Sequence, residues 1–456
     1  MARANAKKEI DMLNGPILPN LLKFALPILL TGVLQQFYST ADTLIVGAMG
    51  GKEALAAVGA TGSTVSLLVT VFSSIFVGTN ILVARAKGIG DEPELKRIVS
   101  TTYIMSLCIG AFLTVIGVFG SRTLLEWTEC PSHIIDASTS YLQIYFCGMI
   151  PSMFTNFAAS VIRSAGDSRS PFIYLSISGL TNVVFNVIFV LILGNPVIAV
   201  ALATLLSMLV SAVLFAIHII RDDGPTGLRP FKFNFHAPTF IKTIKYGIPA
   251  AISSSTFALT NFIIQPTLNS YGDVGISGSA ASTSIEAYIY VITSSINSSV
   301  CTFIGQNIGA GKKARVKEVL IKSYIIGITV MAIFSVVVLS FGKNLLGLFI
   351  PGEAEAIDFG YLRMQMIVGA AAVNAVMNVN GGALHAYGYT FVQMLSNLIG
   401  VCFFRIMWMW FIYPLNETPF NFLICYPVTW TITAVTLFFA VIVLTKKYLR
   451  GKDFKI

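Results

Sequence analysis

The chain has 456 residues, of which 55% are hydrophobic and 11% are charged, with a formal net charge of +9 and a mean hydropathy of +0.78. Soluble globular proteins carry about 25% charged residues, so this composition excludes an ordinary soluble domain. It predicts a protein that crosses a membrane many times.

Long apolar runs separated by short polar breaks follow one another along the whole chain. They cover residues 17–47, 54–84, 98–120, 134–162, 171–194, 196–220, 240–268, 276–305, 318–341, 357–384, 390–413 and 420–445. Most have the ~20 residues that a spanning helix needs. Spanning β-strands would instead be ~10-residue alternating segments. We therefore predict an all-α polytopic membrane protein with about twelve transmembrane helices.

Lysine and arginine gather in every second loop. One set of loops carries Arg3, Lys7, Lys8, Arg85, Lys87, Lys96, Arg97, Arg163, Arg169, Arg221, Arg229, Lys232, Lys242, Lys245, Lys312, Lys313, Arg315, Lys317, Lys446, Lys447, Arg450, Lys452 and Lys455. The opposite set has Lys52, Arg122 and Lys343. Because cytoplasmic loops are enriched in these residues, we expect a multi-pass protein of the inner (plasma) membrane with both termini in the cytoplasm. This topology accounts for the net charge, and no nucleic-acid partner is needed. Contact of the basic loops with anionic headgroups of the lipid bilayer is a by-product.

The second half of the sequence resembles the first. The segments KFALPILL and KYGIPAAI match at a shift of 222, which also carries Gly166 onto Gly388. A shift of 221 places ARAKGIGDEPELKRI on GQNIGAGKKARVKEV and aligns Gly90 with Gly311. Each match lies an even number of helices from its partner, so the repeat has parallel topology.

The repeat divides the chain into two pseudo-symmetric six-helix lobes. We expect an amino-terminal lobe at 1–220, a basic cytoplasmic linker at 221–239 and a carboxy-terminal lobe at 240–456. Such repeats commonly enclose a central cavity that opens alternately to each side of the membrane. This is the architecture of a transporter, although the repeat alone leaves a channel or a membrane-embedded enzyme open.

The first apolar run carries a carboxylate. Gln35, Tyr38, Ser39 and Asp42 are spaced at i, i+3, i+4 and i+7, so they share one face of a helix. A charge near the middle of the bilayer costs several kcal/mol unless it faces protein or water. We therefore expect this face to line a cavity.

The fourth and fifth helices supply further polar residues. Ser178, Asn182 and Asn186 follow one another at four-residue spacing on the fifth helix, and the fourth contributes Tyr141 and Asn156. These side chains are candidates to surround the helix-one carboxylate.

The eighth helix carries a second acidic face. Glu286, Tyr290, Thr293 and Asn297 lie at i, i+4, i+7 and i+11. Glu286 could attract a cationic substrate or carry a proton; the alternative is a structural ion pair with Arg405 on the eleventh helix. Removing one partner of such a pair would be costly.

Four segments together resemble the multidrug and toxic compound extrusion (MATE) transporters. They are ALPILLTGVLQQFYSTADTLIVG, ARAKGIGD, IRSAGDSRSP and FIGQNIGAGK, in this order and in two six-helix halves. The resemblance covers nearly the whole chain. It implies a secondary antiporter that exports organic, often cationic, compounds against an inward flow of protons or sodium ions.

The resemblance also implies a coupling site in the amino-terminal lobe. The family groups an aspartate on helix one with tyrosine and asparagine on helix four and with an asparagine and a following acid on helix five. Asp42, Tyr141, Asn156 and Asn182 fit this pattern, whereas Asn186 is an amide where an acid is common. A single carboxylate gives sodium fewer charged ligands, so we favour H⁺ as the coupling ion; Na⁺ is the alternative, because amide and hydroxyl oxygens could also bind it. Asp42 would take up a proton from outside as substrate leaves; the alternative is a buried, merely hydrogen-bonded aspartate.

The carboxy-terminal lobe lacks the acids that bind sodium in some relatives. Its seventh and tenth helices offer amides such as Asn378 instead. The candidates for a substrate cavity are Gln35, Tyr38, Glu286, Tyr290, Asn297, Asn378 and Arg405.

Other function classes fit the sequence less well. A flippase for a lipid-linked saccharide would be expected to have a more cationic cavity, and mid-helix cations are nearly absent apart from Arg405. No nucleophile–base cluster indicates an enzyme, and no repeated selectivity motif indicates a channel. The six cysteines show no metal or redox spacing, so we expect no metal and no cofactor. We also expect the protein to be monomeric.

Overall fold

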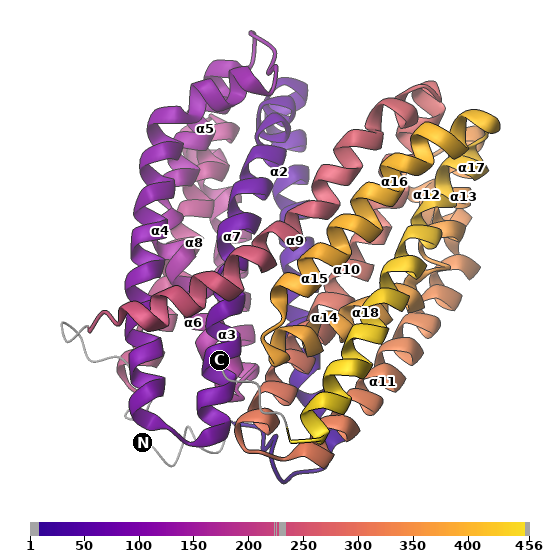
Figure 1. Cartoon of the computed structure of the whole chain (residues 1–456). Helices are drawn as coiled ribbons and strands as arrows, with labels where there is room; N and C mark the ends of the chain where they lie inside the picture. Colours follow the sequence, from indigo (N-terminus) through magenta and orange to yellow (C-terminus); the bar gives the residue numbers. More distant parts are fainter. Residues whose placement is uncertain (1–8, 223, 225, 228–233, 452–456) are drawn as a thin grey trace. The chain divides into compact units, whose positions relative to one another are not determined.

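The computed structural model describes residues 9–222, 224, 226–227 and 234–451, which form helices and no strand (Figure 1). The first half of the sequence repeat gives α2 (Ile17–Ser74), α3 (Phe76–Ile89), α4 (Glu92–Trp127), α5 (Ile135–Cys147), α6 (Met149–Ala165), α7 (Arg169–Leu193) and α8 (Pro196–Ile220). The second gives α9 (Ala237–Asn269), α10 (Gly272–Gly309), α11 (Lys313–Ser340), α12 (Gly342–Phe349), α13 (Ala354–Ile367), α14 (Ala371–Tyr387), α15 (Thr390–Asn397), η1 (Leu398–Phe403), α16 (Phe404–Met407), η2 (Trp408–Ile412), η3 (Tyr413–Leu415), α17 (Pro419–Leu423) and α18 (Cys425–Leu449). The predicted topogenic residues Arg3, Lys7, Lys8, Arg229, Lys232, Lys452 and Lys455 lie outside the described residues.

The predicted all-α membrane fold is confirmed. Among the described residues, nine helices are long and apolar enough to cross a membrane, or eleven if each of two bent pairs is one span. The run Ile17–Ile89 counts once there, but its 73 residues would extend about 110 Å at ~1.5 Å per residue, against ~30 Å of hydrocarbon. It therefore holds two spans, and Gly51, with non-helical backbone angles, lies between them. The described chain thus accommodates twelve spans.

The structure repeats at the turns as well as in the sequence. Three pairs of glycines related by shifts of 221 or 222 adopt positive φ: Gly51 (72°) and Gly272 (65°), Gly90 (81°) and Gly311 (68°), Gly166 (112°) and Gly388 (76°). A side chain would strain this left-handed backbone, which explains why glycine stands at these turns in both halves. The bent spans correspond too: α5 and α6 meet at 48°, and α13 and α14 meet at 43°.

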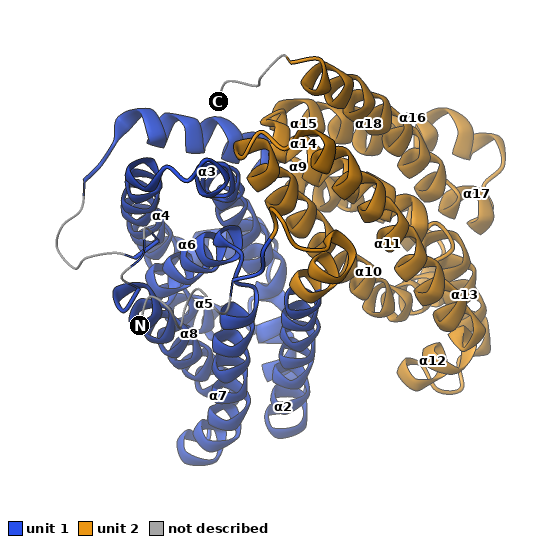
Figure 2. Cartoon of the chain, turned by 90° about the horizontal axis from the view of Figure 1, so that it is seen from below, with its two compact units in different colours: residues 1–11, 26–251 blue, residues 12–25, 252–456 orange. Residues whose placement is uncertain are grey.

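The chain forms two compact units (Figure 2). Unit 1 comprises Met1–Asp11 and Leu26–Ala251, and unit 2 comprises Met12–Ala25 and Ile252–Ile456. These units differ from the predicted lobes, because the start of α2 belongs to unit 2 and the start of α9 belongs to unit 1. Both changes fall within three residues of a proline, Pro27 or Pro249. Proline removes a helical hydrogen bond and permits a bend, so a helix can change packing partners there.

In unit 1 the start of α9 lies directly against the end of α2 and the start of α3. A Cβ added to Gly78 would lie 2.3 Å from the carbonyl oxygen of Thr243, and one added to Gly247 would lie 2.5 Å from that of Ile75. The two missing side chains let the backbones touch. This contact explains why the start of α9 groups with unit 1.

In unit 2 the residues before α2 bind the turn between α10 and α11. Asn307 Nδ2 donates to the Met12 carbonyl at 3.1 Å, and Lys312 Nζ donates to the Leu13 carbonyl at 3.0 Å. About two turns into α2, the ring of Phe24 packs edge-on against Phe303, 5.8 Å between centroids. This segment is therefore part of unit 2 although it begins the chain.

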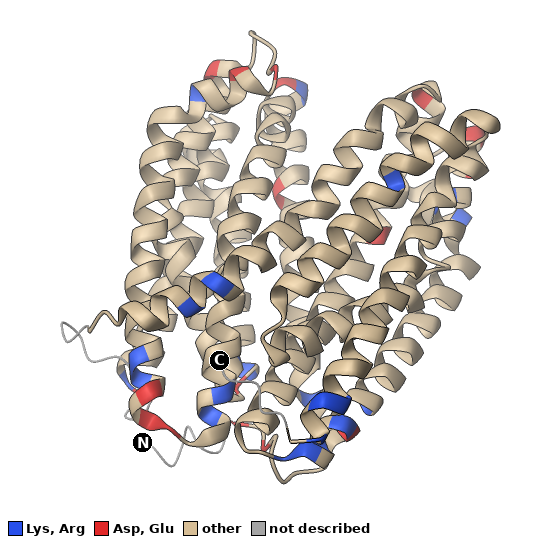
Figure 3. Ribbon diagram, in the orientation of Figure 1, with Lys and Arg blue, Asp and Glu red and all other residues tan. Residues whose placement is uncertain are grey.

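Lysine and arginine gather at one end of each unit (Figure 3). In unit 1 this end holds the turn between α3 and α4, and in unit 2 it holds the turn between α10 and α11, with Lys312 and Lys313. Lys313 Nζ lies 5.7 Å from the centre of the Tyr448 ring near the end of α18. Each unit by itself therefore has one basic end.

Candidate functional site

Asp42 begins a chain of polar side chains through unit 1. It lies half-buried on α2, and Asn186 Nδ2 on α7 donates a hydrogen bond to its carboxylate. Asn186 Nδ2 also donates to Asn182 Oδ1 at 3.3 Å, and Asn182 Nδ2 donates to Thr204 Oγ1 on α8 at 3.3 Å. The chain connects three helices, with the carboxylate at one end.

The amide of Asn186 has a spare acceptor, as three other buried amides among the described residues do. The side chain is fully buried, and within the described residues its Oδ1 has no hydrogen-bond partner. Its two neighbours in the chain accept from the nitrogen only. A buried acceptor without a donor costs about 1–3 kcal/mol, so this atom marks a place where a proton donor or a cation would be favourable.

The four-residue spacing on α7 produces this arrangement. Ser178, Asn182 and Asn186 are all buried on one face, and Ser178 Oγ donates to the Ser207 carbonyl of α8 at 2.6 Å. Successive turns of a helix bring residues four apart into line. The polar stripe predicted from the sequence therefore faces α2 and α8.

Tyr38 fits into a gap left by a glycine. A Cβ added to Gly179 of α7 would lie 1.8 Å from Tyr38 Cε2, so the ring occupies the space of the missing side chain. The Tyr38 hydroxyl donates to the Ser176 carbonyl at 3.4 Å. The predicted helix-one face thus packs on α7 one turn before it reaches Asp42.

The remaining predicted residues of this unit divide into two groups. Tyr141 is buried, stacks on Tyr145 with 6.2 Å between ring centroids, and lies close enough to interact electrostatically with Asp42. Asn156 instead donates to the Ser152 carbonyl of its own helix at 3.0 Å. Gln35 is exposed and makes no hydrogen bond to another described residue. The structure therefore gathers Asp42, Tyr141, Asn182 and Asn186, without Asn156 or Gln35.

Glu286 of unit 2 is bound by an arginine that the sequence analysis missed. Arg363 Nε lies 2.8 Å from Glu286 Oε1 and Arg363 Nη2 lies 2.9 Å from Oε2, a two-pronged contact between α13 and α10. Arg363 Nη1 donates to Ser279 Oγ at 2.8 Å, and Ser282 Oγ donates to Glu286 Oε1 at 2.7 Å. Both charged side chains are buried.

The ion pair of Glu286 with Arg405, one of the two alternatives that the sequence left open, is therefore not formed; the partner of Glu286 is Arg363. Arg405 lies on α16 with 1% of its surface exposed, its guanidinium carbon 4.1 Å from the centre of the Tyr426 ring. Its Nη2 donates to Thr429 Oγ1 at 3.2 Å, and its Nε has no partner among the described residues. The signal that could have revealed Arg363 is its place in YLRMQM, inside a predicted apolar run.

The rest of the predicted face of α10 turns toward α14. Asn297 Nδ2 donates to the Asn378 carbonyl at 3.1 Å, and Asn378 Nδ2 donates to Asn374 Oδ1 at 2.9 Å. Tyr290 is 39% exposed and lies close to both Arg363 and Arg405. The two asparagines connect α10 and α14, and the Tyr290 ring packs on Phe257 of α9 with 6.4 Å between centroids.

In the part of the chain that the structure describes, no three His, Cys, Asp or Glu side chains gather closely enough to hold a metal ion. The cysteines of this part are free and scattered. The polar groups of interest are thus carboxylates, amides and guanidinium groups.

Comparison with known proteins connects this architecture to transporters. The MatE family model matches residues 27–188 and 249–411, one stretch in each half of the repeat. The chain is 27% identical over 398 residues to a probable multidrug resistance protein, YpnP, of Bacillus subtilis, covering 86% of this chain and 87% of that protein. It is 23% identical to a FAD transporter of Shewanella oneidensis, again over 86% and 87% of the two chains. The crystal structure of a MATE transporter in the bent conformation has the same fold, with a TM-score of 0.90, 16% identity and coverage of 97% and 98%.

Proposed function

This chain belongs to the MatE family of multi-pass membrane transporters, and from that premise we propose that it is an antiporter that exports organic compounds, driven by an inward flow of ions. The observation that carries the proposal is the half-buried Asp42 with its hydrogen bond from Asn186. Intramembrane carboxylates are costly and mark ion or substrate pathways. In alternating access, such a group would be loaded on one side of the membrane and unloaded on the other.

The amide at residue 186 suits a site that gains and loses a proton. An ionised carboxylate only accepts hydrogen bonds, whereas a protonated one also donates. Asn186 donates through Nδ2 to the ionised form, and after rotation of its amide the unpartnered Oδ1 can accept from the protonated form. Both states of Asp42 are then satisfied by the same neighbour. An ionised acid at this position would lack a donor for the first state.

We propose H⁺ as the coupling ion, with Na⁺ as the alternative. Asp42 supplies the single charge at this site, and the other oxygens near it belong to neutral amide and hydroxyl groups. Sodium would need several of these oxygens together, since hard cations prefer many oxygen ligands. A proton needs only the carboxylate and one hydrogen-bond partner.

The proposed cargo and setting follow from charge. When Asp42 is ionised, unit 1 carries a half-buried negative charge, which favours cationic groups on a small organic substrate.

The basic end of each unit favours a cytoplasmic location for the turns after α3 and α10, and hence for both termini. One chain carries both units, so a monomer should suffice, and the chemistry is transport rather than catalysis.

The test is dye accumulation in everted membrane vesicles, with a fluorescent organic cation and an imposed pH or sodium gradient. For wild type we expect accumulation driven by the pH gradient without sodium. Asp42→Asn should lose gradient-driven accumulation while still binding dye. Asp136→Asn is the matched control, because Asp136 is exposed at the end of the same unit and should behave as wild type.

Three outcomes would contradict the proposal. Undiminished gradient-driven accumulation by Asp42→Asn would reduce Asp42 to a structural residue. Dye movement that ignores both gradients would favour a channel, and movement of a lipid-linked saccharide in place of dye would favour a flippase. Accumulation driven by sodium alone would keep the antiporter but reverse the choice of ion.

A further inference from the structure

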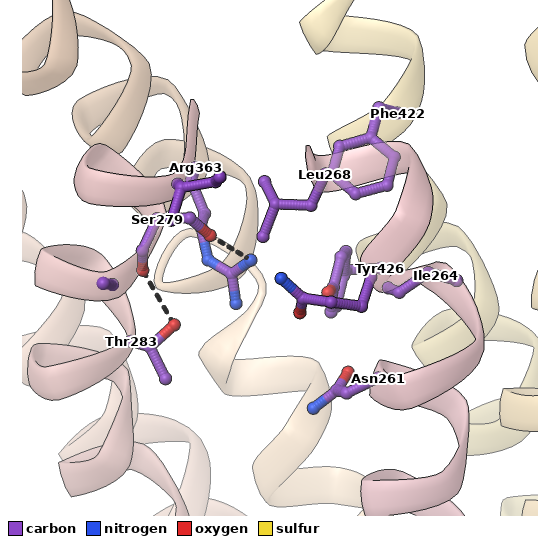
Figure 4. A pocket seen from close by; sticks show the side chains of 11 residues that line it. Asn261, Ile264, Leu268, Ser279, Thr283, Arg363, Phe422 and Tyr426 are labelled. Atoms are coloured by element: carbon purple, nitrogen blue, oxygen red, sulfur yellow. Dashed lines mark hydrogen bonds between the residues drawn. The ribbon is translucent and has the colours of Figure 1, made fainter. Parts of the chain in front are cut away.

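Unit 2 contains a cavity large enough for a small organic molecule. It measures about 440 Å³ and lies among α9, α10, α13, α17 and α18. Figure 4 shows the guanidinium group of Arg363 reaching into it, with Ser279 and Thr283 of α10 on one side and Asn261 of α9 on the other. Small-molecule sites in proteins commonly have volumes of roughly 300–1,000 Å³ and a few polar groups that fix orientation.

The charges around this cavity do not cancel. Glu286 pairs with Arg363, but within the described residues no carboxylate lies at salt-bridge distance from Arg405. The guanidinium carbons of Arg363 and Arg405 lie 5.4 Å and 4.1 Å from the centre of the same Tyr426 ring, and Tyr426 lines the cavity. Two cations and one anion leave one net positive charge beside it.

Both arginines keep donors that are not used. A guanidinium group has five N–H donors. Arg363 uses three of them, two for Glu286 and one for Ser279. Arg405 is almost fully buried and its Nε has no described partner. A buried cation left without an anion is costly in a membrane, so binding of an anion here would relieve an existing cost.

One part of the cavity wall is aromatic. Phe422 and Tyr426 line it, and the Tyr271 ring packs behind Phe422 with 5.9 Å between centroids. Aromatic side chains favour flat ring systems through offset or edge-on contacts. Arginine favours planar carboxylate and tetrahedral phosphate groups, which accept two hydrogen bonds at once.

We propose that the unit 2 cavity binds the anionic group, a carboxylate or a phosphate, of a flat aromatic substrate. Arg363 contacts this group directly, Arg405 supplies the uncompensated positive charge, and Phe422 and Tyr426 hold the ring system. The inference rests on the proposed export function and names its substrate class. The preferred cargo therefore carries an anionic group, alone or beside the cationic group that unit 1 favours.

The test compares binding of matched fluorescent probes to the purified full chain in liposomes without any gradient. One pair is a xanthene dye with a free carboxylate and its methyl ester, and the other is riboflavin 5′-phosphate and riboflavin. We expect wild type to bind at least one anionic probe about tenfold more tightly than its uncharged partner, the effect of one charge-assisted contact. Arg405→Gln should abolish this preference, and Arg405→Lys should retain part of it. Lys343→Gln removes an exposed cation of the same unit and should leave the preference intact.

The two pairs identify the group, since a preference in one pair alone assigns carboxylate or phosphate. Equal affinity of wild type for acid and ester, and for phosphate and riboflavin, would overturn the proposal without any variant having to fold. If Arg405→Gln lost the same amount of affinity for both probes of a matched pair, the proposal would also be overturned, because the residue would then act structurally. Gradient-driven accumulation of the cationic dye in wild-type vesicles tests the export function separately, so the two failures are distinguishable.

Discussion

Removing one partner of the Glu286–Arg363 ion pair should destabilise the protein more than removing both. Glu286→Gln removes the charge that holds Arg363 through two hydrogen bonds of 2.8 and 2.9 Å. Hydrogen bonds to charged groups contribute roughly 1.5–3 kcal/mol each, and breaking a buried pair by removing one partner costs about 3–5 kcal/mol. We expect a loss of unfolding free energy in that range. The double variant Glu286→Met with Arg363→Met leaves no newly unpaired charge, because Arg405 lacks a carboxylate partner in wild type as well, and it should lie within about 1–2 kcal/mol of wild type.

The assay is reversible denaturant unfolding of the purified protein in detergent micelles. Fluorescence of Trp430, which is fully buried in unit 2, reports the transition. Asp358→Asn breaks the exposed pair with Lys343 and should leave the midpoint unchanged. The single variants Glu286→Met and Arg363→Met complete the cycle. The reasoning is refuted if the double variant is destabilised by the sum of these two, because the coupling between Glu286 and Arg363 would then be zero.

Three further predictions follow from close contacts. Gly382→Ala would place a Cβ 2.5 Å from the backbone oxygen of Asn297, so it should lower the free energy of unfolding by about 1–3 kcal/mol in the same assay. At Gly327 the nearest atom to an added Cβ is 3.5 Å away, so Gly327→Ala should be neutral or stabilising. Gly179→Ala should displace the Tyr38 ring and slow dye accumulation, and adding Tyr38→Ala should restore folding stability but not transport. Asn186→Leu removes the hydrogen-bond partner of Asp42 and should abolish pH-driven accumulation at unchanged membrane abundance; full activity would show that the amide is dispensable.

Helix boundaries could be predicted from the sequence where a local signal marks them. The predicted run 196–220 coincides with α8, because Pro196 occupies its first turn and Asn195 caps it, accepting a hydrogen bond from the Ile198 amide at 3.3 Å. The break expected between 47 and 54 is much smaller in the structure. Helical geometry continues to Ser74 apart from Gly51, because a single glycine with positive φ suffices for the turn.

Partners across helices could not be predicted in the same way. Helical periodicity places Asp42 and Glu286 on their own faces, but it says nothing of which helix packs against each face. Two buried arginines were available to Glu286, and the packing of α13 on α10 brings Arg363 rather than Arg405 into contact. Similarly, the stripe containing Asn186 could be read from α7 alone, whereas its contact with α2 depends on the gap at Gly179.

The π-helical segments η1 and η2 flank the short α16 that carries Arg405. A π-turn holds about one residue more than an α-turn, so each segment shifts the phase of everything after it by roughly 100°. Deleting one residue from η1 would therefore swing Arg405 about a quarter-turn away from Tyr426 without changing a single side chain of the cluster. In a related sequence that lacks this extra residue, the position directly aligned with Arg405 would face a different neighbour. The direction in which the Arg405 side chain leaves the helix is thus set by the helical phase of the preceding backbone as much as by its position in the sequence.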